Sequence, residues 1–288
     1  MSILSGLGSF GLGDLMSAEL FEDEEEEKEE EKDELQNKQL QEEIQLHSEH
    51  EFIFLKSYSC PVCNQEFKNP TVRYNRARKE RIDPDLRVRY SNVDPLKYGV
   101  ICCPTCGYAA LANQFDQLSL PQIRLIRENI SVNFSGLPVK EVLDYSDAYS
   151  RYELALANAI VKRAADSEKA NLCLKLSWLL QSRIDNFDQE IYFGEGGFEE
   201  TEKKLKSLRT NALDGFRRAK KKENPPICGM DSSALNYLMA VLAFDAELYT
   251  EAEDYLAVAL QGGISNKKMK KMALDLEKKL RYKRKGMA

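Results

Sequence analysis

The sequence predicts an α+β protein that is mostly α, with a small β-rich module ahead of an all-α domain. Three observations lead to this prediction. Cysteines occur in two Cys-Pro-x-Cys pairs, Cys60–Cys63 and Cys103–Cys106, with 39 residues between them. Each pair follows a short stretch in which apolar residues alternate, as they do in a strand. From residue 119 onward, apolar residues recur three and four positions apart, as on one face of a helix.

The two cysteine pairs predict one metal site. Its ligands are Cys60, Cys63, Cys103 and Cys106. Tetrahedral Zn²⁺ takes four thiolates at about 2.3 Å, and each Cys-x₂-Cys turn presents two. The residue after such a turn needs a left-handed backbone, which Gly107 adopts without strain and Asn64 tolerates. We therefore expect one structural Zn²⁺, with an unmetallated thiol switch as the alternative.

The spacing between the pairs is long for a compact four-cysteine ribbon, which has about 15–20 residues there. Doubling a loop costs only about 0.6 kcal/mol of closure entropy. A structural zinc contributes roughly 10–16 kcal/mol, so the insert is tolerable.

The strands and the insert of the β-rich module follow from local pattern. Glu51–Lys56 and Tyr98–Cys102 alternate apolar residues and lead into the two pairs. On such a strand Cys102 points to the face opposite the ligand Cys103, so we expect it to be a small buried apolar residue. The insert Arg73–Arg89 contains seven basic residues with Tyr74 and Tyr90 at its ends. A solvated loop is the simpler interpretation, and a nucleic-acid face is the alternative.

The second half predicts a series of helices. Ser119 is a candidate N-cap for the first, and Gly136 is expected to close it. The expected helices are Leu120–Asn133, Ser146–Ala164, Ser167–Ile184, Glu199–Glu223, Ser232–Leu248, Thr250–Leu260 and Lys267–Lys285.

Two of these helices share a spacing of small and large residues. Ala212, Phe216 and Ala219 repeat as Ala252, Leu256 and Ala259. This is the spacing of the second helix of a tetratricopeptide repeat, in which small residues let two helices approach closely. Their partner first helices would be Leu172–Gln181 and Ala234–Phe244, with Ser177 and Ala240 at the small positions.

Composition and charge complete the domain organisation. Glu19–Glu34 carries twelve acidic residues against two lysines, and Lys267–Ala288 carries ten Lys and Arg. The acidic run Glu19–Glu34 repels itself and has no apolar surface to bury, so we expect it to form a linker. Both histidines, His47 and His50, lie beside glutamates at the end of this linker. The expected segments are a short apolar N-terminal segment (1–18), an acidic disordered or partly helical linker (19–50), a zinc-ribbon-like module (51–117) and a tetratricopeptide-like domain with a basic C-terminal helix (118–288).

The arrangement resembles an uncharacterised bacterial family, domain of unknown function 2225. The resemblance rests on the opening Gly-Leu-Gly-Ser-Phe-Gly-Leu (6–12), on Tyr58 to Phe67 around the first pair, on Asp94-Pro-Leu-x-Tyr98, and on Cys103 to Ala110. It implies a zinc-ribbon-like module followed by a tetratricopeptide-like one, the same four ligands, and no established activity. Asn64 departs from the glycine expected after the first pair.

Several function classes are excluded or disfavoured. The N-terminus has no basic-then-apolar signal, and no apolar run reaches the roughly 18 residues of a membrane span, so a cytoplasmic protein with reduced thiols is expected. A four-cysteine zinc has no open position for catalysis, and neither histidine lies in a folded module. Gly6-x-Gly8-x-x-Gly11 has no strand before it, which argues against dinucleotide binding.

We therefore expect a non-enzymatic interaction or adaptor protein with a protein or peptide partner at the helical repeat. Nucleic-acid binding through Arg73–Arg89 and a zinc or thiol redox sensor are the alternatives. The oligomeric state stays open.

Overall fold

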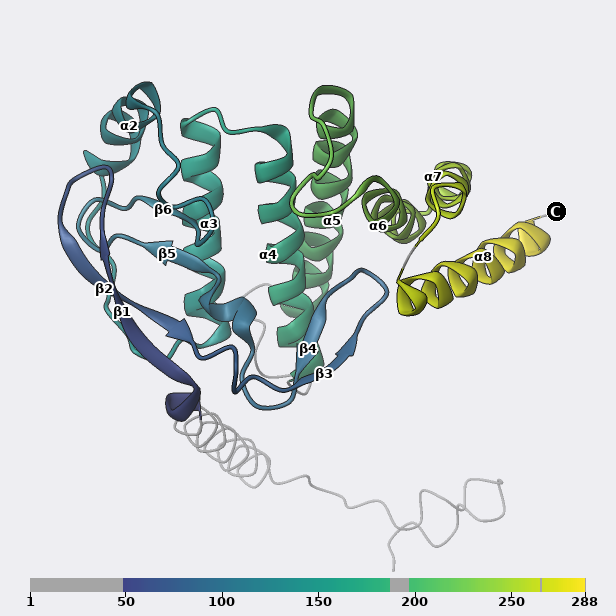
Figure 1. Ribbon diagram of the computed structural model, residues 1–288, viewed down its shortest axis with the longest axis horizontal. Helices are drawn as coiled ribbons and strands as arrows, with labels where there is room; N and C mark the ends of the chain where they lie inside the picture. Colours follow the sequence, from purple (N-terminus) through teal and green to yellow (C-terminus); the bar gives the residue numbers. More distant parts are fainter. Residues whose placement is uncertain (1–48, 187–196, 265, 288) are drawn as a thin grey trace, which may run out of the picture. The chain divides into compact units, whose positions relative to one another are not determined.

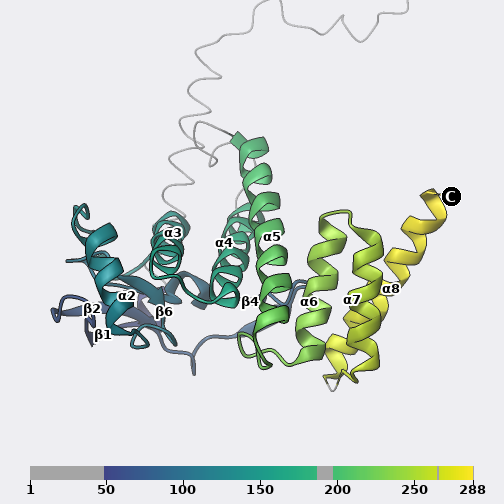
Figure 2. The same ribbon diagram turned by 90° about the horizontal axis from the view of Figure 1, so that it is seen from above.

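The computed structural model describes residues 49–186, 197–264 and 266–287 (Figures 1 and 2). The expectations for residues 1–18, for the acidic run and for His47 lie outside these ranges. None of the helices within the ranges is long and apolar enough to cross a bilayer.

The β part consists of three antiparallel strand pairs, formed by consecutive strands: β1 with β2, β3 with β4, and β5 with β6. The first and third pairs carry the cysteine turns, and the second lies in the basic insert. The strands are β1 (Ile53–Ser59), β2 (Glu66–Val72), β3 (Lys79–Ile82), β4 (Val88–Tyr90), β5 (Val100–Cys102) and β6 (Ala109–Leu111).

The hairpin of β5 and β6 lies between two cores, because successive side chains of a strand point to opposite faces. Val100 and Cys102 pack on α3 (Tyr145–Val161), together with Leu111 of β6. Ile101 and Cys103, the ligand position after the strand, pack instead into the cluster that holds the other cysteines. We call β1, β2, β5, β6 and the two cysteine turns the cysteine module.

The helices follow the expected order. We call α3 to α8 the helical domain. Their bounds, with those of the short α2, are α2 (Leu120–Ile126), α3 (Tyr145–Val161), α4 (Asp166–Asn186), α5 (Gly197–Lys222), α6 (Ser232–Asp245), α7 (Tyr249–Gln261) and α8 (Lys267–Met287).

The first of these helices is shorter than predicted. Ser119 does begin α2, with its backbone N–H donating to Gln122 Oε1 at 3.0 Å. However, the α-helical part ends at Ile126, and the next residues, Arg127–Ser131, form a wider π-helical turn. Gly136, at φ 102°, therefore lies beyond the helix and does not close it directly.

Neighbouring helices pack in sequence order, and Figure 2 shows α3, α4 and α5 side by side, followed by α6 and α7. The close approach of α4 and α5 depends on small residues. A Cβ on Gly215 would lie 2.7 Å from Ala170 Cβ, too near for any larger side chain. The two residues expected at small positions of the first helices, Ser177 and Ala240, have no exposed surface.

All of the repeated small and large residues of α5 and α7 are buried in the same core. Their exposed fractions are at most 2%: Ala212, Phe216, Ala219, Ala252, Leu256 and Ala259. Helices α4 and α5 pack on each other, as do α6 and α7, in the pairs that the sequence predicts. The spacing therefore marks real helix–helix contacts.

The folded part includes the last residues of the expected linker. Glu49 is 4% exposed, and its two carboxylate oxygens each lie 2.7 Å from Lys97 Nζ. Tyr98 donates its hydroxyl to the same carboxylate at 2.9 Å. Because a buried carboxylate is stable only when it is paired, these contacts fix the chain at the start of β1.

Candidate metal centre

The first cysteine turn follows β1 and closes by two backbone hydrogen bonds. Asn64 N–H donates to the Cys60 carbonyl at 2.8 Å, and Cys60 N–H donates to the Gln65 carbonyl at 3.0 Å. Asn64 has φ 61°, the left-handed conformation expected after Cys63. Asn is one of the few residues with a side chain that adopts this conformation readily.

The second turn repeats this geometry after β5. Gly107 N–H donates to the Cys103 carbonyl at 3.1 Å, and Cys103 N–H donates to the Tyr108 carbonyl at 2.8 Å. Gly107 has φ 72°, and a Cβ there would lie 2.6 Å from the Phe134 ring. Two features therefore require glycine at position 107: the positive φ angle, which strains other residues, and the Phe134 ring, which leaves no space for a Cβ.

The two turns bring four sulfur atoms together. The Sγ atoms of the predicted ligands all lie within 4.8 Å of one another. Cys60 and Cys106 are 3.6 Å apart, as are Cys63 and Cys103. A disulfide is about 2.05 Å long, so these are separate thiols. Four sulfurs around one tetrahedral Zn²⁺ lie about 3.8 Å apart, and the cluster fits such an ion.

Electrostatics within the cluster favour a bound cation. Hydrogen bonds from the Cys106 and Cys60 thiols lower the pKa of Cys103 to about 2. The reverse partnership, in which Cys60 donates to Cys103, raises the pKa of Cys60 to about 12. The opposite directions of these shifts show that the thiols interact strongly through their protons. A divalent cation held here would take all four sulfurs as thiolates and release their protons.

Two side chains from later in the chain hold the turns in place. Arg127, in the π-helical turn after α2, donates from Nε to the Val62 carbonyl at 2.8 Å. Asn158 of α3 is fully buried and donates to the Gly107 carbonyl at 2.9 Å. Each turn is therefore anchored by one side chain from a helical segment, a feature typical of metal sites with ordered ligands.

A buried polar contact supports the strand before the second turn. Asn69 of β2 is 2% exposed, and its Oδ1 accepts from Arg151 Nη1 at 3.1 Å and from Cys102 N–H at 3.5 Å. This contact joins β2, β5 and α3.

Cys102 is excluded from the cluster, as predicted. It is 2% exposed on the α3 face of the hairpin, and burial raises the pKa of its thiol to about 12. Cys173 and Cys228 lie in the helical domain, the first buried and the second exposed. His50, which the sequence placed in a solvated linker, is 54% exposed and lies 3.4 Å from Glu141.

The basic insert differs from the solvated loop that we expected. Between β3 and β4 the chain turns at Asp83–Arg87, which we call the hairpin tip. Arg87 has a 5% exposed side chain and pairs with Asp83 at 2.7 Å and with Asp185 of α4 at 2.5 Å. Arg89 pairs with Asp83 at 2.7 Å. Two of the seven basic side chains are thereby neutralised inside the molecule.

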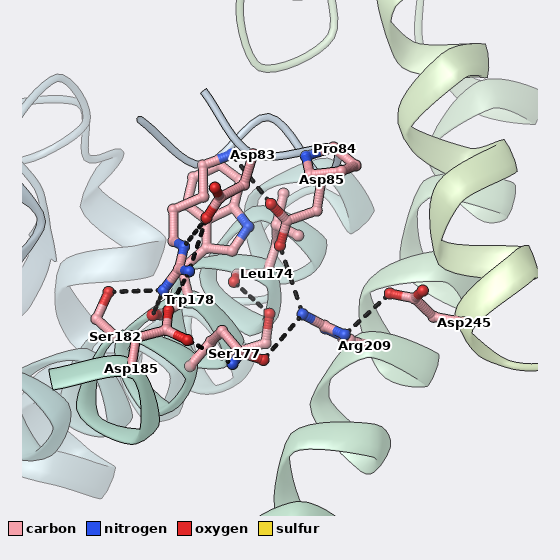
Figure 3. Close-up of polar contacts among 12 residues, drawn as sticks. Asp83, Pro84, Asp85, Leu174, Ser177, Trp178, Ser182, Asp185, Arg209 and Asp245 are labelled. Carbon is pink, nitrogen blue, oxygen red and sulfur yellow. Dashed lines mark hydrogen bonds and ion pairs between the residues drawn. The ribbon is translucent and has the colours of Figure 1, made fainter. Parts of the chain in front are cut away.

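The hairpin tip docks on the helical domain (Figure 3). Tyr237 of α6 donates its hydroxyl to the Pro84 carbonyl at 2.8 Å. Arg209 of α5 lies between Asp85, at 3.5 Å, and Asp245 of α6, at 2.9 Å. No short-range pattern in the sequence marks these contacts, since the partners are separated by up to 153 residues.

A groove of about 740 Å³ lies beside the docked tip. Its walls come from the tip, from α6 and from α8, with Gln181 of α4 and Arg209 of α5 at one end. A partner at the helical repeat stays a prediction, and α6, one of the expected first helices, lines this groove. The contribution of the hairpin tip was not predicted.

Comparison with known proteins gives a family match and nothing further. No curated protein and no solved structure matches the chain. The family model described as "Uncharacterized protein conserved in bacteria (DUF2225)" matches residues 53–280, from the start of β1 into α8. This range contains all four clustered cysteines and the groove. The chain belongs to this family.

Proposed function

We propose that this protein is a non-enzymatic interaction protein in which a structural Zn²⁺ stabilises the cysteine module and the groove binds a peptide segment of a partner. The observation that carries the proposal is the groove itself. Its volume lies in the range of functional binding sites, and helices of a repeat domain form much of its wall.

Zinc is the ion that suits the four-cysteine cluster. Soft thiolates select Zn²⁺ over Mg²⁺ or Ca²⁺, and four of them fill a tetrahedral shell. A filled shell leaves no position for water or substrate, so the role of the ion is structural. The cysteine module has a small core, and metal binding supplies the missing stabilisation.

The floor of the groove is suited to apolar side chains of a peptide. Tyr237, Val241 and Phe244 recur on one face of α6, at helical spacing. Met272 and Leu276 face them from α8. Side chains inserted at this spacing are the usual anchors of a bound peptide.

The charge of the groove favours a basic residue in that peptide. Although the lining as a whole carries four carboxylates and four cations, Asp85 and Asp245 share one ion-pair partner, Arg209. Lys279 acts on Asp245 only at longer range. Burial raises the pKa of Asp245 above its ordinary value, although Arg209 opposes the shift. A Lys or Arg from a partner would compensate the carboxylate that burial disfavours. The expected ligand is therefore a segment with apolar anchors and at least one basic side chain.

The experiment is a selection from a library of random 12-residue peptides on the full-length zinc-loaded protein. We expect enriched peptides to combine apolar residues with Lys or Arg, and to bind Asp245→Lys at least about tenfold more weakly. Asp254→Lys, on the exposed side of α7 and outside the groove, is the matched control and should bind as the wild type does.

Enrichment of acidic peptides, or equal binding to both variants, would overturn the proposal. Binding of nucleic acid with a steep salt dependence that survives Asp245→Lys would point instead to the exposed part of the basic insert.

A further inference from the structure

A second cavity, of about 450 Å³, lies where the basic insert, the cysteine module and the helical domain meet. It shares no lining residue with the groove. Leu86 of the hairpin tip faces this cavity, whereas its neighbour Asp85 faces the groove. The hairpin tip therefore contributes to two separate spaces.

Among the residues that the structure describes, Lys175 of α4 is the one charged side chain that lines this cavity. Within the described ranges it forms no ion pair, and its ammonium lies 5.2 Å from the centre of the Trp178 ring. Burial lowers the pKa of Lys175, with Cys228 and Asp94 opposing the shift from a distance. A partly buried ammonium that only an aromatic face supports is poorly compensated.

Trp178 supplies a second donor that lacks an acceptor. Its Nε1–H is buried and has no hydrogen-bond partner among the described residues. Because this nitrogen has almost no accessible surface, it does not reach the cavity, and Lys175 is the group that a ligand would contact. Trp178 lies one helical turn from Lys175 and lines the same cavity.

The rest of the lining is neutral. Carboxamides are present at Asn113 and Asn171, and the apolar wall is formed mainly by leucine and methionine side chains: Leu86, Leu111, Leu174, Met230 and Leu238. A space with one cation, some neutral polar groups and a set of leucine and methionine side chains suits a small ligand that carries one negative charge and an apolar part.

We propose that this cavity binds a small monocarboxylate, with its carboxylate on Lys175 and its apolar body against the leucine and methionine side chains. Carboxylate is favoured over phosphate because the lining offers a single cation, and a phosphate dianion is ordinarily bound by several. The volume suits a compact ligand, because most small-molecule sites occupy about 300–1,000 Å³.

The test uses the fluorescence of Trp178, the single tryptophan of the chain, so the signal arises at the cavity itself. The probes are hexanoate and hexanamide, which have the same apolar body and differ in charge. We expect a saturable change with hexanoate at millimolar concentrations and binding of hexanamide at least about tenfold weaker. This comparison needs no variant.

Variants then locate the site. Lys175→Gln should weaken hexanoate binding by at least about tenfold, because a charge-assisted hydrogen bond is lost. Lys169→Gln, on the same helix but paired with Asp166 outside the cavity, should leave it unchanged.

Three outcomes would overturn the proposal. They are no saturable response to hexanoate, equal affinity for the amide, and full affinity in Lys175→Gln. Inorganic phosphate is the last probe, and binding as tight as that of hexanoate would show that the site is not selective for carboxylates.

Discussion

The cysteine module and the helical domain are stabilised in opposite ways. The cluster around the cysteines contains ten buried residues, and three of them are predicted ligands. The main core of the helical domain contains 22, nearly all of them apolar or aromatic and none of them a ligand. We therefore expect one region to depend on a metal ion and the other on apolar burial. The comparison indicates which perturbation should unfold which part.

The largest expected effect comes from removing one ligand. Cys60→Ser should abolish stoichiometric zinc and remove most of the roughly 10–16 kcal/mol that a structural zinc contributes. Metal analysis and hydrogen exchange should show loss of zinc together with loss of protection in β1 and β2, while α6 and α7 stay protected. Cys102→Ser, which changes a buried non-ligand, should retain its zinc. Collapse of protection in α6 would show that the two regions form one cooperative unit.

A cavity in the helical core should have the reverse effect. Phe216 has no exposed surface, and Phe216→Ala should cost about 3–5 kcal/mol of unfolding free energy. Denaturant unfolding measures the loss, and zinc content should remain at the wild-type level. Loss of zinc in this variant would contradict the separation of the two regions.

The hairpin tip links the regions through charge. Burial raises the pKa of Asp83, but hydrogen bonds from Arg89 and Arg87 outweigh it, and the folded value lies below the ordinary 3.8. Its stabilisation is therefore present above about pH 4 and is lost as the pH falls through the folded pKa. Asp83→Asn should lower the free energy of unfolding by about 1–3 kcal/mol at pH 7, because Arg87 loses a charged partner.

The measurement for the hairpin tip is the free energy of unfolding of both proteins as a function of pH. The difference between wild type and Asp83→Asn should shrink toward zero at low pH. A difference that stays constant down to pH 3 would indicate that Asp83 acts through packing and not through its charge.

The smallest effect is expected at the exposed anchor of the first turn. Arg127→Ala removes the hydrogen bonds to the Val62 carbonyl and should lower the free energy of zinc binding by about 1 kcal/mol. Asn158→Ala removes a fully buried anchor of the second turn and should weaken zinc binding by about tenfold. Competition with a chromogenic chelator measures both. Equal effects would mean that burial of the anchor makes no difference.

The sequence predicted what depends on neighbouring residues. The clustering of the four cysteines, the left-handed turn residues Asn64 and Gly107, the opposite orientation of Cys102 and the order of the helices all follow from local spacing. The anchors Arg127 and Asn158 were missed because each acts on a carbonyl more than 50 residues away. A carbonyl is present in every residue, so no side-chain pattern marks such a contact.

The basic insert is a second region whose contacts could not be predicted from local sequence. Its composition shows that the insert is basic. Whether Arg87 is solvated or buried depends on its ion pair with Asp185, which lies 98 residues later in the chain. Once paired, Arg87 is a buried structural residue and not a surface cation. Charge composition indicates what a segment can pair with, and only the tertiary fold decides where the partner lies.

The position of the β5–β6 hairpin between two cores has a consequence for folding. Cys102 and Cys103 are adjacent, and the native pairing of Cys102 with Ala109 determines which of them reaches the other three sulfurs. Slippage of the pairing by one residue would exchange the two faces, burying Cys103 against α3 and presenting Cys102 to the ion. Either alignment places a cysteine thiol beside the other three sulfurs, so metal binding alone does not distinguish the native alignment from the slipped one. In the native alignment Gly107 has the left-handed backbone that the turn needs and lies against Phe134, so we expect this turn to favour the native pairing over the slipped one.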